Sequence, residues 1–449
     1  MANCALVICG FNVIPWQNFR NAVFCLQNKR IASRYLVGTA ERLFLDRCRM
    51  ICNLCCFRSA SITNLVDRVR DCACSDPRDR IYGVLGMLSE NDRSLKIIPD
   101  YQKSIDQVYR DFFLCHLTHF KYNNLVLLAS CEMQDHRSTT PSWVPDWSRK
   151  RIARSFDGSF ASGSSAAEVE YTGGGSLRVL GVKVATIKDA DQIHMHHKEW
   201  IDVVAMIRQC IPTIVIRNGG ELFDKYCRTI CGDFFRDRYD PPLSFLPSLY
   251  ESQESLKVFL RLPEDFDLGK SMNLLTTDYV DAVLSVAQNR TFISTEAGDI
   301  GLAPLLAKSG DEVVVIPGCP PPMVLHPTDD GRYQVVGACF ILGFMDGEAL
   351  LGPLPEGYEC FNKLTEEDNH RHKAYRDLRT DEVQWTDPRF NLFRSEMQED
   401  GIRRIFISGS EIDAENINGD CGVRMKTSSL PSGGEVIVMG VDLKPFELI

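Results

Sequence analysis

The feature that most restricts the fold is a series of short apolar runs between residues 291 and 342, separated by turns. The runs are rich in Val, Ile and Phe, and Gly and Pro stand between them, as in Pro317-Gly318 and Asp330-Gly331. Several short strands with turns at close spacing predict a small antiparallel barrel or sandwich. The expected strands are 292–294, 313–316, 323–325 and 333–342.

A further strand is predicted at Leu177–Ile187, a Val-rich run that alternates in part. It has no strand partner close in sequence, and an isolated strand would leave its backbone groups unpaired. We therefore expect it to join the sheet formed by residues 291–342. The runs 402–407 and 436–441 are expected to add edges to the same sheet.

Apolar residues recur with helical spacing in several segments outside these strands. We expect an α+β fold, with a helical N-terminal half followed by helices packed on the small antiparallel β-barrel or sandwich. The expected helices are 15–26, 39–50, 81–88, 104–117, 200–207, 222–230 and 279–287.

The same patterns divide the chain into four parts: 1–147, 148–175, 176–354 and 355–449. The first is helical, the second is a Gly/Ser-rich loop or linker, the third holds helices plus the barrel, and the fourth is a polar extension with edge strands. A basic run, Arg149-Lys150-Arg151 with Arg154, opens the second part. It is interpreted as a solvated loop edge, with a nuclear import signal or an anionic ligand contact as alternatives.

Composition limits the partners of the chain. Of its 449 residues 44% are hydrophobic and 24% are charged, which is ordinary for a soluble globular protein. The net charge of −10 makes it a poor general binder of phosphate backbones, so no nucleic-acid partner is expected. The sequence contains no stretch of 18 apolar residues, so it predicts no membrane span.

Eighteen cysteines are many, and eleven lie in the first 131 residues. Residues 1–10 lack the basic start and cleavage site of a signal peptide, so we expect a cytoplasmic protein with reduced thiols. Cys52 and Cys55 have the CxxC spacing of a zinc half-site, but Cys72-x-Cys74 is one residue short of a second half. Cys48, Cys52 and Cys55, with Cys56 beside them, fit one buried helical face better.

Other candidate sites are weaker. His194, His196 and His197, and His370 with His372, lack Cys or acidic partners at ligand spacing and are predicted to be exposed loops. Asp346-Gly347-Glu348 offers two carboxylates, but Gly343 and Gly347 favour a bend with Asp346 at its turn. The chain has no phosphate-loop, HExxH or GxSxG signature, and Gly173-Gly174-Gly175 precedes a strand. We predict no catalytic, cofactor-binding or metal-binding residues, and no cofactor.

Seven blocks in order nevertheless resemble motifs of the fungal heterokaryon incompatibility (HET) family. The first, Asp76-Pro77-Arg78-Asp79-Arg80-Ile81-Tyr82-Gly83-Val84-Leu85-Gly86, is similar to a hallmark of that family. The others are Pro99-Asp100-Tyr101 with Ser104 and Val108-Tyr109; Pro141 to Trp147; Tyr226-Cys227-Arg228-Thr229; Phe292 with Thr295, Gly298, Gly301-Leu302 and Pro304; Gly310-Asp311 with 322–325, Tyr333 and Val336-Gly337; and Met345 to Ala349.

The resemblance implies a role in nonself recognition and programmed cell death in filamentous fungi. It also implies that residues 1–147 are a C-terminal remnant of the HET domain, an α/β domain distantly similar to the Toll/interleukin-receptor fold. The family's earlier blocks are absent, so we expect an N-terminally truncated form that alone neither kills cells nor hydrolyses NAD.

The matched motifs have structural explanations. Asp76 is a candidate N-cap, and Pro77 then occupies the first helical position, where its missing donor is harmless. Contact of Arg78 or Asp79 with a ligand or partner is the alternative. Trp143 and Trp147 are predicted to pin a loop to the core, with an aromatic ligand platform as the alternative.

Two functional hypotheses follow. The first is an interaction or regulatory protein of the HET family with an unidentified protein partner. The second is an enzyme or accessory protein of small-molecule metabolism with a pocket between the helices and the barrel. An enzyme should bring titratable residues together in one cleft, whereas an interaction module should expose an apolar patch.

Overall fold

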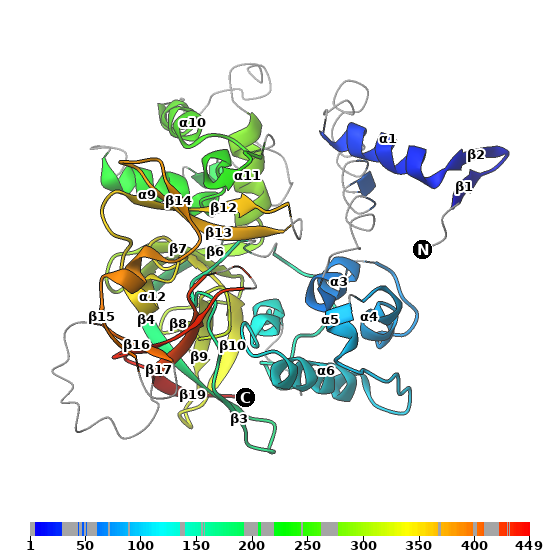
Figure 1. Ribbon diagram of the computed structural model, residues 1–449. Coiled ribbons are helices and arrows are strands. Elements are labelled where there is room, and N and C mark those ends of the chain that lie inside the picture. Colours follow the sequence, from blue (N-terminus) through cyan, green and yellow to red (C-terminus); the bar gives the residue numbers. More distant parts are fainter. Residues whose placement is uncertain are drawn as a thin grey trace. The chain divides into compact units, whose positions relative to one another are not determined.

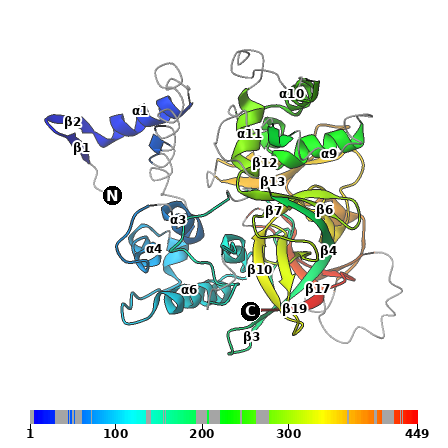
Figure 2. The same ribbon diagram turned by 180° about the vertical axis from the view of Figure 1, so that it is seen from behind.

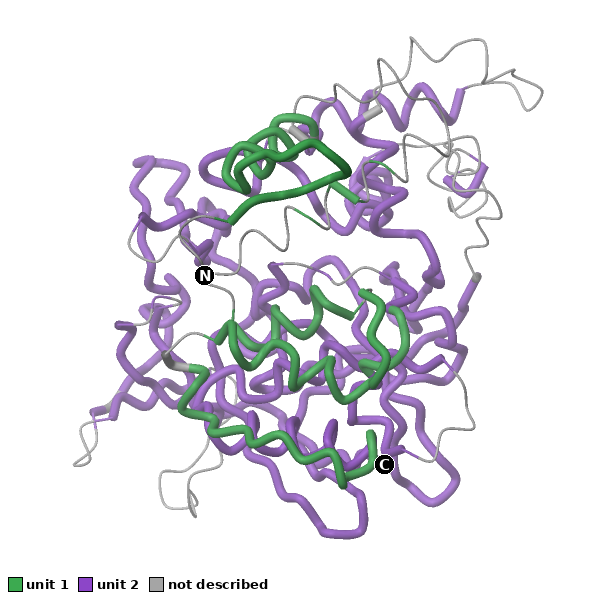
Figure 3. Tube along the Cα trace, turned by 90° about the vertical axis from the view of Figure 1, so that its right-hand side faces the viewer, with its two compact units in different colours: residues 1–105, 147–150 green, residues 106–146, 151–449 purple. Residues whose placement is uncertain are grey.

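The structure is a computed structural model in which the chain divides into two compact units (Figure 3). Unit 1 comprises residues 1–105 and 147–150, and unit 2 comprises residues 106–146 and 151–449. The structure describes residues 5–28, 44, 47–48, 51, 61–70, 72–88, 90–134, 140–153, 156, 158–192, 205–207, 220–243, 246–261, 277–366, 370–397, 402–407, 422–428, 430 and 432–449. The predicted α+β class is confirmed, whereas the four-part division of the chain remains a prediction about domains.

Five strands of unit 2 close into a barrel (Figures 1 and 2). Around the ring, β4 pairs with β19, β19 with β10, β10 with β9, β9 with β8, and β8 again with β4. Only the β10–β19 pair is parallel. Closure leaves no unpaired strand edge in the ring. The strands are β4 Leu177–Gln192, β8 Glu312–Val315, β9 Met323–Pro327, β10 Tyr333–Ala338 and β19 Lys444–Leu448.

The long strand β4 links the barrel to four more strands. Beyond its pairing with β8 it pairs with β6, which continues to β7 and β11, and its first residues also pair with β3. The strand predicted at Leu177–Ile187 thus joins the later strands in one sheet, as expected, across more than 100 residues. The added strands are β3 Val169–Tyr171, β6 Arg290–Thr295, β7 Ile300–Pro304 and β11 Phe340–Ile341.

Three helices pack against this extension of the sheet. They share a core with β6 and β7, in which Tyr226 contacts Phe292 edge to face at 5.8 Å and Phe259 stacks on Tyr279 at 6.5 Å. Aromatic pairs of this kind add to the free energy of burial. The helices are α9 Glu221–Ile230, α10 Leu249–Arg261 and α11 Thr277–Ala287. The first and last match the predicted helices; of the helix predicted at 200–207, residues 200–204 lie outside the described residues.

Two four-stranded sheets do not pair with the barrel strands, although the first shares an apolar core with Val315 of β8. The prediction that 402–407 and 436–441 extend the barrel sheet is wrong, because β16 and β18 pair with each other and with β15 and β17. Their apolar residues face a core shared with α12 and η8. These strands are β15 Arg394–Met397, β16 Arg403–Phe406, β17 Gly422–Lys426 and β18 Glu435–Met439.

The second of these sheets has the order β14-β13-β12-β5. Its strands β12 and β13 form a seven-residue antiparallel ladder, and β5 adds to β12 in parallel. Residues of β12 and β13 at the middle of the ladder are buried. The elements here are η5 Arg236–Arg238, β5 Tyr239–Asp240, α12 Glu348–Leu351, β12 Tyr358–Leu364, β13 Arg371–Asp377, β14 Val383–Gln384 and η8 Pro388–Asn391.

The Gly/Ser-rich loop has a buried middle. Ala161, Ser162 and Ser165 are fully buried, so a segment with the composition of a loop or linker here packs into the interior. Backbone bonds join it to distant strands, with Ala166 N donating to Arg424 O and Lys426 N donating to Ser164 O. Small side chains allow this approach: a Cβ on Gly163, where φ is +61°, would collide with Met425.

Unit 1 combines a hairpin with short helices. The helix predicted from residue 15 is confirmed as α1, whereas the one predicted at 81–88 is interrupted after Tyr82 into α4 and η3, and Leu85 is only half-buried. The helix at 39–50 lies largely outside the described residues. The elements are β1 Leu6–Cys9, β2 Asn12–Pro15, α1 Trp16–Asn28, α3 Ile62–Val69, α4 Asp79–Tyr82, η3 Leu85–Met87 and α5 Glu90–Arg93.

The remaining helices are α6 Ile105–His119, which matches the helix expected at 104–117, and η4 Val126–Ser130. Val108, Tyr109, Phe112 and Phe113 form the buried side of α6. Within the part of the chain that the structure describes, no helix has both the length and the apolar character needed to cross a bilayer.

Candidate functional site

Several buried charges surround Asp346, in the turn between β11 and α12. Arg238 Nη2 and Lys373 Nζ each lie 2.6 Å from a different oxygen of its carboxylate. Arg238 comes from η5 and Lys373 from β13, so one carboxylate joins three segments that are far apart in the sequence. The side chains of Asp346 and Lys373 are only 11% and 6% exposed. Buried charges of this kind are tolerated only when they are paired.

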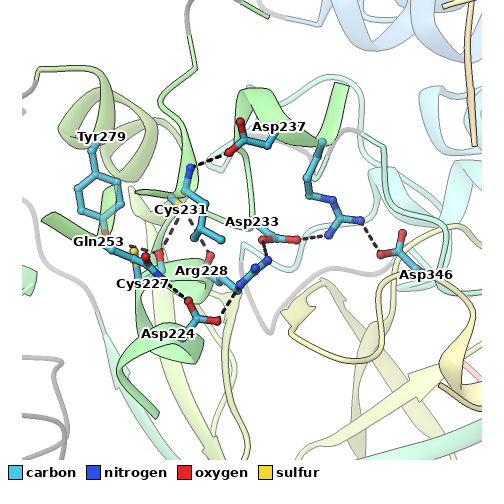
Figure 4. A network of polar contacts seen from close by, with 11 residues as sticks. Asp224, Cys227, Arg228, Cys231, Asp233, Asp237, Gln253, Tyr279 and Asp346 are labelled. Carbon is cyan, nitrogen blue, oxygen red and sulfur yellow. Dashed lines mark hydrogen bonds and ion pairs between the residues drawn. The ribbon is translucent and has the colours of Figure 1, made fainter. Parts of the chain in front are cut away.

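The network continues from Arg238 to Asp224, whose side chain is 38% exposed (Figure 4). Arg238 also bonds Asp233, whose other oxygen accepts from Arg228 Nη1 at 2.8 Å. Arg228 Nε then donates to Asp224 at 3.1 Å, and Gln253 Nε2 of α10 donates to the same carboxylate at 2.6 Å. Charges therefore alternate in sign from Asp224 to Lys373. We call Asp224, Arg228, Asp233, Arg238, Asp346 and Lys373 the Asp346 network.

The end of α9 positions the middle of the network. Tyr226, Cys227 and Ile230 bury one side of the helix, which leaves Arg228 on its partly exposed side. The chain then turns through Gly232 and Asp233, which both have positive φ, and Asp233 N donates to Arg228 O. Asp tolerates this left-handed conformation better than most residues. The turn places the Asp233 carboxylate between the two arginines.

A second buried pair adjoins the network on the side of η8. Arg389 is 1% exposed; its Nη2 bonds both the Asp387 carboxylate at 2.7 Å and Asp346 O at 2.8 Å. Tyr375 donates its hydroxyl to the same oxygen, Asp387 Oδ2, over 2.9 Å. Gly347, at φ +89°, lies against Arg389, where a Cβ would come within 3.1 Å of its guanidinium. This pair therefore fixes the turn that presents Asp346.

The electrostatics keep the central groups charged. Burial alone would raise the pKa of Asp346, but the charges of Arg238 and Lys373 outweigh it and hold that pKa well below its ordinary value. Burial would lower the pKa of Lys373, yet Asp346 raises it above its ordinary value. Burial raises the pKa of Glu348, and the charge of Asp346 adds to the shift. The pKa values of the two carboxyl groups in Asp346-Gly347-Glu348 are thus shifted in opposite directions.

The arrangement is better explained as a set of ion pairs that hold distant segments together than as a reactive centre. The Sγ of Cys360 lies 3.8 Å from Asp346 Oδ1, and burial raises the pKa of this thiol to about 12. At neutral pH it is a thiol, whereas the thiolate is the reactive form. Asp346 itself accepts bonds from two cations and so is not free to take a proton. Sequence analysis placed Asp346 correctly at a turn but missed its partners.

The Asp-Pro-Arg-Asp motif forms a different cluster, in unit 1. The Arg78 guanidinium bonds the Asp76 carboxylate at 2.7 Å and the backbone oxygen of Lys103 at 2.9 Å. Tyr101 donates its hydroxyl to Asp79 at 2.6 Å and lies under the Arg78 guanidinium. We call Asp76, Arg78, Asp79 and Tyr101 the Asp76 cluster.

The Asp76 cluster satisfies the motif internally. Asp76 Oδ1 accepts from Arg78 N, although the helix α4 begins only at Asp79, so the predicted cap became an Asx-type turn before the helix. Hydrogen bonding to Arg78 lowers the pKa of Asp76, and hydrogen bonding to Asp79 raises that of Tyr101. Two blocks of the sequence, Asp76 to Gly86 and Pro99 to Tyr101, are brought together here.

The remaining predicted sites are dispersed. Trp143 and Trp147 are fully buried, each within its own unit, and Trp143 Nε1 donates to Gly175 O, which favours the loop-pinning interpretation. In the basic run, Arg149 and Lys150 are exposed and Arg151 is half-buried, while Arg154 lies outside the described residues. A solvated loop edge fits the first two.

The cysteine and histidine motifs are only partly covered by the structure. Cys48 is buried, Cys72 is half-buried and Cys74 is exposed, whereas Cys52, Cys55 and Cys56 lie outside the described residues. The residues His194, His196 and His197 also lie outside them. His370 is exposed as predicted, but His372 belongs to β13 and is half-buried, so the exposed-loop prediction is wrong for it. The described residues contain no group of three or more His, Cys, Asp or Glu suited to a metal ion.

Comparison with known proteins gives one match. Residues 265–352 match the model of the Het-6 beta-barrel domain, which is found in fungal heterokaryon incompatibility proteins. The matched residues include β6 to β11 and the turn that carries Asp346. No curated protein and no solved structure matches the chain.

Proposed function

We propose that this chain is a HET-family protein that regulates heterokaryon incompatibility in a filamentous fungus, through nonself recognition and programmed cell death. The observation that carries the proposal is the Het-6 beta-barrel match at residues 265–352. The ordered resemblance of further blocks supports it, because Arg228 and Asp346, from two of those blocks, meet through Asp233 and Arg238 in one network.

The protein acts by binding a protein partner in the cytoplasm. The Asp346 network supports a binding role over catalysis, since its charges are paired with each other and Cys360 is held as a thiol. The network ties α9, η5, the Asp346 turn and β13 to one another, which suits a surface that a partner must recognise.

The proposal is tested by deleting the gene in its source fungus and pairing the strain with otherwise incompatible strains. Deletion should abolish the incompatibility reaction in at least one pairing, and the wild-type gene should restore it. Asp346→Asn should fail to restore it, whereas Asp330→Asn, which removes a charge from an exposed pair with Arg332, should succeed. A deletion strain that keeps every incompatibility reaction would contradict the proposal.

One observation favours an alternative, an enzyme of small-molecule metabolism. The pKa values of Asp346 and Glu348 are displaced in opposite directions, a pattern that acid–base pairs share. The substitution Glu348→Gln keeps the volume but removes the titratable proton. It should restore incompatibility fully if binding is the function; failure in a stably folded Glu348→Gln protein would favour the enzyme.

A further inference from the structure

The hairpin of unit 1 exposes an unusual amount of apolar surface. Strands β1 and β2 are joined by the two-residue loop Gly10-Phe11, in which Gly10 has φ +60°. Phe11 at the tip is fully exposed. The exposed fractions along the hairpin are 59% for Leu6, 68% for Ile8, 107% for Phe11, 57% for Val13 and 37% for Ile14.

Both faces of this hairpin are apolar. Ile8 pairs with Val13 across the strands, and the neighbouring pair, Val7 with Ile14, lies on the opposite face because side chains alternate along a strand. A two-stranded ribbon with one face in water normally alternates apolar and polar residues. Here residues 1–19 contain no Asp, Glu, Lys, Arg or His at all. Asn12 is the one polar side chain of the two strands, so the hairpin is suited to an apolar medium on both faces.

A lipid surface supplies such a medium, whereas a protein docked on one face would leave the other in water. The hairpin can insert only to a limited depth, because the outer edges of its two strands carry backbone N–H and C=O groups for which hydrocarbon offers no hydrogen-bond partner. Strands of four residues reach only about 13 Å. Trp16 directly follows β2, and tryptophan favours the boundary between headgroups and acyl chains.

The sequence that follows the hairpin is rich in basic residues, which complement an anionic membrane. Residues 1–50 hold seven Lys or Arg against two Asp or Glu, although the whole chain holds 50 against 60. Among the described residues of this stretch, Arg20 is half-buried and Arg47 is exposed. Clustered basic residues next to an apolar anchor strengthen binding to anionic lipid.

We propose that the hairpin Leu6–Pro15 inserts into the interfacial layer of an anionic lipid bilayer, with Phe11 at its deepest point and Arg20 of α1 at the headgroups. This makes the chain a peripheral membrane protein, independently of the function proposed above.

The test is sedimentation of the full chain with vesicles of phosphatidylcholine, with and without phosphatidylserine. The chain should pellet with the phosphatidylserine vesicles, pellet less with phosphatidylcholine alone, and be released by salt. Phe11→Ser should weaken partitioning about tenfold or more, because one large apolar side chain no longer leaves water. Phe11→Trp should keep the binding, and its added fluorescence should shift to the blue on vesicles.

Ile98→Ser is the matched control, since Ile98 is 81% exposed in unit 1 but lies outside the hairpin. It should partition like the wild type. Three results would each overturn the inference: no binding of the wild type to either vesicle, equal loss with Ile98→Ser and Phe11→Ser, or a self-associated chain in solution that Phe11→Ser dissociates. The last result would mean that the hairpin binds a second copy of the chain and not a lipid surface. Unchanged unfolding curves for the variants exclude loss of structure as the cause.

Discussion

The Asp346 network in unit 2 and the Asp76 cluster in unit 1 use the same kinds of side chain over very different spans of sequence. Asp76 and Arg78 are two residues apart, and their side chains are 29% and 23% exposed. Asp346 lies 108 residues from Arg238 and 27 from Lys373. The first pair fixes a turn and its neighbouring loop, whereas the second holds together elements that nothing local connects.

This difference has an energetic consequence. Ion pairs near water contribute little, because solvent and salt screen them and ordering two long side chains costs entropy. A buried pair is not in itself a strong source of stability, but removing one partner leaves an uncompensated charge in the interior. We therefore expect substitutions in the Asp346 network to be severe and those in the Asp76 cluster to be mild.

The largest effect is expected for Asp346→Asn, which leaves Arg238 and Lys373 facing a neutral amide. We expect unit 2 to lose about 3–5 kcal/mol of unfolding free energy. Urea unfolding followed by circular dichroism measures it. Asp330→Asn, in an exposed pair with Arg332, is the control and should leave the midpoint nearly unchanged. Equal effects of the two substitutions would remove the contrast between buried and exposed pairs.

A smaller effect is expected for Lys373→Met, because Asp346 then keeps Arg238 as a partner. The loss of one charge-assisted hydrogen bond predicts about 2 kcal/mol. The control is Lys363→Met on the neighbouring strand β12, where Nζ lies 2.6 Å from Asp240 but the side chain is 33% exposed. It should cost less than about 1 kcal/mol. A larger loss for Lys363→Met in the same unfolding assay would show that burial does not decide the outcome.

The pH dependence sharpens the same comparison. Since the pKa of Asp346 is lowered in the folded state, its stabilisation is complete above the ordinary Asp pKa of about 4 and is lost as the pH falls through the folded value. The difference in urea midpoint between wild type and Asp346→Asn should therefore stay constant at neutral pH and narrow only below about pH 4. If the difference in urea midpoint began to narrow near pH 6, Arg238 and Lys373 would not be keeping the pKa of Asp346 low.

The smallest effect is expected for Asp76→Asn. The amide oxygen can still accept from Arg78 N, so the turn survives while the charge is lost. The midpoint for unit 1 should shift less than the midpoint of unit 2 does in Asp346→Asn or Lys373→Met, and added salt should remove most of that shift. A salt-independent loss comparable to that of Lys373→Met would place the Asp76 cluster among the buried pairs.

Local patterns predicted the local structure well. The spacing of Trp16, Phe19 and Val23 located α1, and the Val-rich run after Leu177 located β4 and its need for distant partners. The strands from 291 to 342 were found because their turns contain Gly and Pro. Periodicity could not find the break after Tyr82, since Ile81, Val84 and Leu88 are buried whether or not the helix is continuous.

Pairings between residues far apart in the chain could not be predicted from the sequence. Nothing in the composition of residues 436–441 distinguishes a barrel strand from one that pairs with β16, because both are short apolar runs. The Gly/Ser-rich loop has the composition of a linker, yet its small side chains serve close packing around Gly163. The partners of Asp346 were missed for the same reason, although the charges that follow α9 were a usable signal.

The central claim is that Asp346 couples segments that lie far apart in the chain. Amide hydrogen exchange of wild type and Asp346→Asn tests it most directly, in conditions where both proteins remain folded. The account predicts that the C-terminal end of α9, η5 and strand β13 lose protection together, while α3 and α4 of unit 1 are unchanged. Loss of protection confined to the turn at residues 343–348, with α9 and β13 as protected as in wild type, would contradict it.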